Sequence, residues 1–146
     1  MKSVLLHLFL VGGGWDSSAN AVIYQAFVEA ATRGEQRSIV SIHVAEPEDG
    51  AEEQQEQVAR SQQVLLAAGA STDDIHSITL SQGDVLSAKT LAQYQPTAVF
   101  VWGGLTPLYQ QVLTSDTSWV SYLQEHQVGY GGFSAGAAIS AEKAIV

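Results

Sequence analysis

Three apolar runs along the chain each lead into a glycine-rich segment. The runs are Val4–Val11, Ala98–Trp102 and Val128–Gly131. Continuous apolar runs of this length that are bounded by glycine are typical of strands buried on both faces of a parallel sheet. Because parallel strands place their carboxyl ends at one edge of the sheet, we expect the three glycine-rich turns to meet there. The pattern therefore predicts a functional site at that edge.

Two further strand patterns and several helical patterns fill the rest of the chain. The strands are expected at residues 38–45 and 75–80. The helices are expected at residues 21–32, 85–94, 105–113 and 119–126, with another after the acidic segment 47–56 that stops near Gly69. The first helix should begin after an N-cap at Asn20 and bury Val22, Ile23, Ala26, Phe27 and Ala30. This alternation predicts an α/β fold, a three-layer, doubly wound and mostly parallel sheet in one domain over residues 1–146.

The segment after the last strand reads Gly132-Phe133-Ser134-Ala135-Gly136, which has the spacing G-x-S-x-G. Two glycines at this spacing allow a sharp turn from a strand to a helix, on which the serine oxygen is exposed as a nucleophile. The N–H of Ala135 would then lie at the start of the helix, where it could stabilise an oxyanion. A turn rich in glycine, serine and alanine that performs no chemistry is the alternative interpretation of these five residues.

The loop after the first strand begins Gly12-Gly13-Gly14-Trp15. It matches neither the dinucleotide pattern G-x-G-x-x-G nor the phosphate-binding loop G-x-x-x-x-G-K-[ST], and no lysine is near. Because it follows a strand at the predicted functional edge, we expect Gly13, Gly14 and Trp15 to line a substrate site.

Composition narrows the classes of partner. The chain carries 6 Lys and Arg against 15 Asp and Glu, a formal charge of −9, so neither nucleic acid nor an anionic membrane surface is an expected partner. It contains no cysteine, which excludes a thiolate metal site and a cysteine nucleophile. The adjacent Asp73 and Asp74 are interpreted as a turn and a helix cap rather than a metal site, and no cofactor is expected. The apolar N-terminus lacks a signal-peptide cleavage pattern, so we expect a cytoplasmic protein.

Three of these segments together resemble peptidase family S51, the serine peptidases that include aspartyl dipeptidase (peptidase E) and cyanophycinase. They are the strand ending in Gly12-Gly13-Gly14, the strand ending in Trp102-Gly103-Gly104, and Gly132-Phe133-Ser134-Ala135-Gly136-Ala137. The resemblance implies a class I glutamine amidotransferase-like fold, related to the flavodoxin-like arrangement. It also implies a hydrolase with Ser134 as nucleophile and an oxyanion hole formed by Gly103, Gly104 and the N–H of Ala135. A small peptide, aspartyl in that family, would be the substrate.

The chain departs from the family pattern after the serine. The resemblance implies a histidine downstream of the nucleophile, but no histidine follows Ser134. His43 is the only histidine expected at the functional edge. We expect it to be a solvent-exposed residue at a strand end, and its strand to lie away from the nucleophile strand. His126 is expected at the opposite end of the last strand. We interpret the chain as incomplete at its C-terminus, and we expect a homodimer or association with the missing segment.

Three functions remain open from the sequence. The first is a serine peptidase that cleaves short acidic or aspartyl peptides and whose base and acid lie outside this chain. The second is a non-catalytic glutamine amidotransferase-like binding or regulatory module, which the absence of a base favours. The third is an ester hydrolase that shares G-x-S-x-G, although the three glycine-rich turns fit it less well.

Overall fold

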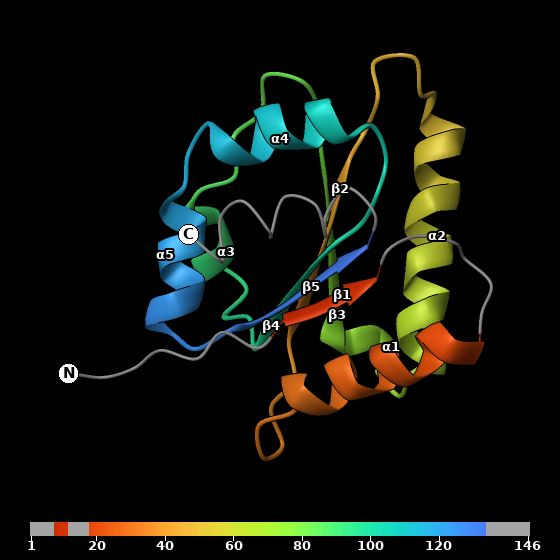
Figure 1. The fold of residues 1–146 in the computed structure, drawn as a ribbon, viewed down its shortest axis with the longest axis vertical. Coiled ribbons are helices and arrows are strands. Elements are labelled where there is room, and N and C mark those ends of the chain that lie inside the picture. The colour runs from red at the N-terminus through yellow and green to blue at the C-terminus, as the bar shows by residue number, and fades with distance from the viewer. Residues whose placement is uncertain (1–7, 12–17, 134–146) are drawn as a thin grey trace.

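A five-stranded parallel sheet forms the centre of the structure, a computed structural model that describes residues 8–11 and 18–133 (Figure 1). The sheet order is β1-β5-β4-β2-β3. All four pairings between neighbouring strands are parallel. The strands are β1 (Leu8–Val11), β2 (Ile39–Val44), β3 (Ile75–Leu80), β4 (Ala98–Val101) and β5 (Gly129–Phe133).

Helices cover both faces of this sheet, which makes three layers (Figure 1). On one face lie α1 (Ser18–Ala31) and α2 (Ala51–Ala67). On the other face lie α3 (Ala88–Ala92), α4 (Thr106–Thr114) and α5 (Ser118–Glu125). The predicted α/β class and parallel sheet are therefore confirmed, and each predicted strand and helix before Ser134 has a counterpart in the described part of the chain.

Local chain signals explain where several elements end. Gly69 follows α2 with φ +115°, a left-handed conformation that glycine adopts without strain, so the predicted helix stop is confirmed. Asp73 and Asp74 lie in a short 3₁₀ helix (Thr72–Asp74), which Ser71 and Asp74 close with a capping box. The predicted turn and cap are thus confirmed at the aspartate pair.

The prediction for α1 is wrong in its start and only partly right in its buried face, where the burial of Phe27 is confirmed and Ile23 and Ala26 are half-buried. The helix begins at Ser18, so Asn20 lies inside it and is not the N-cap. The side chains that are buried are Tyr24, Phe27, Val28 and Ala31, whereas Val22 is 66% exposed and Ala30 is also exposed. Aromatic contacts with the sheet decide the orientation, because Tyr24 stacks on Trp102 at a ring-centroid distance of 6.0 Å.

Two apolar clusters, one on each face, form the core. Under α1 and α2 the aromatic rings of Phe27, Phe100 and Trp102 pack against one another, with Phe27 and Phe100 edge to face at 5.1 Å. Under α3, α4 and α5 the core is built from aliphatic strand residues with Leu108, Val112, Trp119 and Leu123 from the helices. These four helical side chains are buried. None of the helices in the described ranges combines the length and apolar character that crossing a membrane requires.

Candidate active site

The three strands that lead into glycine-rich segments are neighbours in the sheet. β5 lies between β1 and β4, with Gly132 opposite Leu10 on one side and opposite Val101 on the other. The strands are parallel and nearly in register at their carboxyl ends, since Val11 pairs with Phe133. The prediction that these strand ends share one edge of the sheet is confirmed for the described residues.

The glycines at the end of β5 belong to the strand, which corrects the predicted extent of the turn. β5 continues to Phe133, and both Gly131 and Gly132 are paired with neighbouring strands. A Cβ on Gly131 would come within 2.2 Å of the Phe100 ring and 3.1 Å of the Phe27 ring. Glycine is therefore required at residue 131 because two aromatic side chains occupy the space of a side chain.

Five of the predicted site residues lie outside the described residues. They are the nucleophile Ser134, the oxyanion donor Ala135, and Gly13, Gly14 and Trp15 of the first loop. The chain position of Ser134 is still informative, because it directly follows the last residue of β5. A nucleophile elbow requires its serine at that point, at the end of a strand.

The Gly103–Gly104 turn is described, and it follows β4 at the same edge as the end of β5. The phenol O–H of Tyr109 in α4 donates a 3.0 Å hydrogen bond to the carbonyl oxygen of Gly103. A Cβ on Gly104 would approach the Tyr109 ring to 2.8 Å, so only glycine fits without a shift of the ring. Tyr109 was not among the predicted site residues; its one signal in the sequence is an aromatic residue in the first turn of the helix that follows the two glycines.

His43 is buried, contrary to the predicted exposure at a strand end. Its side chain is 3% exposed, and its Nε2 lies 2.9 Å from Ser61 Oγ on α2. Ser61 donates its own proton to the carbonyl of Val58, so Nε2 of His43 must be the donor to Ser61. Burial lowers the pKa of His43 to about 4. The ring also stacks on Trp102, with centroids 6.1 Å apart.

His43 is poorly placed to serve Ser134 as a base. β4 separates β2, which carries His43, from β5, so the prediction that the two strands lie apart is confirmed. The other two described histidines do not replace it. His76 lies on the edge strand β3, and His126 caps the C-terminus of α5 just before β5 begins, at the opposite end of that strand from Phe133.

Charged side chains are distributed unevenly between the two ends of the sheet. Glu46 and Asp49 follow β2 at the candidate edge. Arg33 and Arg37 lie between α1 and β2, at the opposite edge. There Arg33 donates to the carbonyls of His126 and Gln127, while Arg37 forms a 3.3 Å ion pair with Asp74. These two arginines are thus engaged away from the candidate site.

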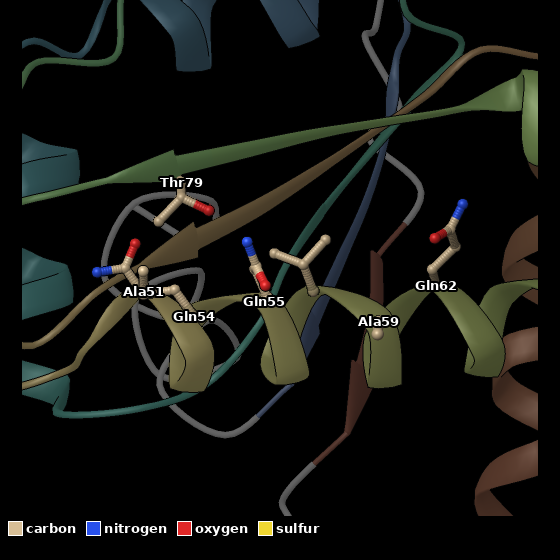
Figure 2. Close-up of a pocket in the computed structure, with 7 residues that line it drawn as sticks. Ala51, Gln54, Gln55, Ala59, Gln62 and Thr79 are labelled. Carbon is tan, nitrogen blue, oxygen red and sulfur yellow. The ribbon is translucent and has the colours of Figure 1, made fainter.

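A hollow of about 460 Å³ lies between α2 and β3 and is a rival location for a site. Figure 2 shows its lining, in which glutamine side chains from α2 lie beside Thr79 of β3. The lining residues are Ala51, Gln54, Gln55, Val58, Ala59, Gln62 and Thr79. These groups can form hydrogen bonds but include no acid, base or activated nucleophile, and β3 is the strand farthest from β1 in the sheet. The hollow therefore offers no catalytic chemistry.

Within residues 8–11 and 18–133, no three histidine, aspartate or glutamate side chains come together as a metal site.

Known structures share the fold of this chain, but no family match was found. No protein-family model matches the chain, and no curated protein matches it significantly. A peptidase from an acI-B1 Actinobacterium is similar in structure, with a TM-score of 0.62, 19% sequence identity, and coverage of 91% of this chain and 55% of that one. A protein provisionally named Peptidase E from Listeria monocytogenes EGD-e has a TM-score of 0.57 and 19% identity, with 92% and 61% covered. The chain therefore shares the α/β fold of these two structures and spans less than two thirds of either.

Proposed function

We propose that this chain is the nucleophile-bearing part of a serine-type peptidase that cleaves short peptides through an acyl-enzyme on Ser134. The observation that carries the proposal is the place of β5 between β1 and β4. The three strands β1, β5 and β4 are therefore neighbours, and the sequence predicts a functional site at the glycine-rich segments that follow them. Both structural neighbours are named as peptidases, which supports the same reaction class.

Strand register supports a short distance between nucleophile and oxyanion hole. Gly132 pairs with Val101, and Ser134 and Gly103 each follow those partners by two residues. Adjacent strands lie about 5 Å apart, which is within the span of one peptide group bound across the two strand ends. A substrate carbonyl attacked by Ser134 could then accept hydrogen bonds from the Gly103–Gly104 turn and from Ala135.

In the proposed reaction the hydroxyl oxygen of Ser134 bonds to the carbonyl carbon of the scissile peptide, and its proton passes to a general base. The C–N bond then breaks as the amine leaves with a proton, and water releases the acyl group from the serine. His43 is sealed between β2 and α2, and its depressed pKa makes it a weak base. We therefore assign the base and its acidic partner to groups outside the described residues.

The substrate's charge is a separate question. The resemblance to family S51 implies aspartyl peptides, whose recognition requires a cation near the site. Tyr109, beside the Gly103–Gly104 turn, has its pKa raised by burial and, less strongly, by the negative charges of Glu46 and Asp49. These two carboxylates would repel an acidic side chain on this side of the site. A panel of aspartyl, alanyl and lysyl dipeptides would distinguish the two expectations.

A serine-directed fluorophosphonate probe tests the nucleophile. We expect covalent labelling at Ser134 in the full-length protein that also contains the base, located by mass spectrometry of the peptide, and no labelling of Ser134→Ala. Ser115→Ala, which alters a serine in the segment between α4 and α5, is a matched control and should label as the wild type does. A folded full-length protein that resists the probe and hydrolyses no peptide of the panel would overturn the proposal.

The second candidate function is a non-catalytic binding or regulatory module of the same fold. The specific observation in its favour is that no histidine in the described part of the chain faces the end of β5. It predicts that a dipeptide of the panel raises the melting temperature of the chain equally in the wild type and in Ser134→Ala, without hydrolysis.

Association with another segment or a second copy is part of the proposal. Among the described strands, β1 pairs with β5 on one side only, so its outer edge carries backbone groups that a further strand could pair with. Light scattering on a size-exclusion column would give the mass of the particle and decide between a monomer and a dimer.

A further inference from the structure

We propose that Tyr109 is a positioning residue that aims the oxyanion-hole peptide between Gly103 and Gly104. The inference rests on the proposed function, because the peptide has this role only if Ser134 attacks a substrate carbonyl. Tyr109 would contact neither substrate nor nucleophile. It acts through the backbone that does.

The peptide unit that joins Gly103 and Gly104 has a fixed orientation. The carbonyl of Gly103 and the N–H of Gly104 belong to the same planar group, and in a trans peptide they point in opposite directions. None of the described peptide bonds is cis. The 3.0 Å hydrogen bond from the Tyr109 phenol holds the Gly103 carbonyl toward α4. The N–H of Gly104 therefore points in the direction opposite to the carbonyl that Tyr109 holds, and we assign it as the oxyanion donor.

The Tyr109 side chain is itself held in place by packing, so the position of the donating hydroxyl group is fixed. Tyr109 is 1% exposed and belongs to the core cluster beneath α4 and α5. Its backbone N–H donates to the carbonyl of Leu105, which places it in the first turn of α4. On its other side the ring abuts Gly104 so closely that a Cβ there would lie 2.8 Å from Cε1. The turn is therefore held by the packing of the Tyr109 ring and by the hydrogen bond from its hydroxyl group.

The hydroxyl group remains a donor under all ordinary conditions. Burial raises the pKa of Tyr109 to about 12, so the phenol keeps its proton at neutral pH. α4 also contacts β2, the strand next to β4. The Tyr109 hydroxyl therefore holds the turn after β4 against a helix that is packed on the neighbouring strand.

The decisive variant is Tyr109→Phe, which keeps the ring and removes the hydroxyl group. We expect the N–H residual dipolar coupling of Gly104 to change, because its peptide plane is released. We also expect the maximal rate of Ser134 labelling by a fluorophosphonate to fall about 10-fold to 100-fold, while the probe's binding constant changes little. Loss of an entire oxyanion donor lowers rates by about 100-fold to 1,000-fold, so a misaimed donor should cost less.

Ser38→Ala is the matched control, because the hydroxyl of Ser38 also donates to a backbone carbonyl, that of Tyr94, at 2.9 Å. It lies at the opposite end of the sheet, just before β2 begins. It should alter neither the Gly104 coupling nor the labelling rate. A purely structural role for Tyr109 predicts that both variants lose stability alike and label at the same rate.

The possible outcomes separate the two proposals. An unchanged Gly104 coupling in Tyr109→Phe, or an unchanged labelling rate, overturns the positioning role. A folded wild type that is not labelled overturns the proposed function, and the coupling then still decides whether Tyr109 sets the peptide, because it requires no catalysis. Should Tyr109→Phe fail to fold, the wild type provides the test. A Tyr109 hydroxyl proton bound to Gly103 exchanges slowly with water, whereas fast exchange overturns the inference.

Discussion

The buried histidine of β2 makes a specific prediction about acid stability. His43 is enclosed between the sheet and α2, where its Nε2 donates to Ser61 and its ring stacks on Trp102. Protonation would place a positive charge in this apolar layer. Burial therefore lowers the pKa of His43 from 6.5 to about 4.

The sign and size of the effect follow from linkage. Between the two pKa values the unfolded chain binds a proton at His43 and the folded chain does not, so stability falls as the pH falls. The contribution of neutral His43 is fully present above pH 6.5, and its loss is complete below the folded pKa. From a pKa of 6.5 falling to about 4, we expect a loss of about 2 kcal/mol at pH 5 and about 3 kcal/mol at pH 4.

Urea unfolding followed by tryptophan fluorescence measures this loss directly. The free energy of unfolding should be determined for the wild type and for His43→Gln at several pH values between 7 and 4.5. The glutamine amide of this variant can still donate to Ser61 but does not titrate in this range. We expect the pH dependence of His43→Gln to be shallower by nearly one proton, whatever its stability at pH 7.

The variant His126→Gln is the matched control, because its side chain is exposed next to the C-terminus of α5. It should keep the wild-type slope. If the wild type and His43→Gln instead lose stability in parallel between pH 6.5 and 4.5, then His43 is not buried as a neutral group and the reasoning fails.

Two further predictions concern packing and hydrogen bonding in the sheet. Gly131→Ala should destabilise the chain by about 1–3 kcal/mol or more, because its Cβ would meet the Phe100 ring at 2.2 Å. The added substitution Phe100→Leu should recover part of that loss in urea unfolding, and strict additivity of the two changes would contradict the contact. Thr97→Val should cost about 1–3 kcal/mol by thermal or urea unfolding, because Thr97 Oγ1 accepts from the buried N–H of Ser38 at 2.9 Å. An unchanged stability would mean that this N–H finds another acceptor.

Much of the architecture could be predicted from the order of residues. Apolar runs that end in glycine marked β1, β4 and β5, and the alternation with helices indicated a parallel sheet covered on both faces. These signals are local, because strand burial and helix periodicity are set by neighbours in sequence. The expected position of His126, at the opposite end of its strand from the serine, followed from strand direction in the same way.

Other features depended on contacts between distant parts of the chain. The buried face of α1 was mispredicted because aromatic stacking on Trp102, not the tally of apolar residues, orients the helix. His43 was expected to be exposed because its burial depends on α2 folding across the strand. The requirement for glycine at residue 131 was not predicted, because it comes from the Phe100 ring on a neighbouring strand.

The sequence alone determined the fold class and the residues that could carry chemistry, above all Ser134 and the Gly103–Gly104 turn. Only the tertiary structure decided the strand order, because nothing in a strand's own residues specifies which strand becomes its neighbour. That order places β5 between β1 and β4, so the carboxyl ends of these three strands lie side by side. The tertiary structure also showed the hydrogen bond of Tyr109 to the Gly103 carbonyl, because this contact exists only after α4 packs against the sheet.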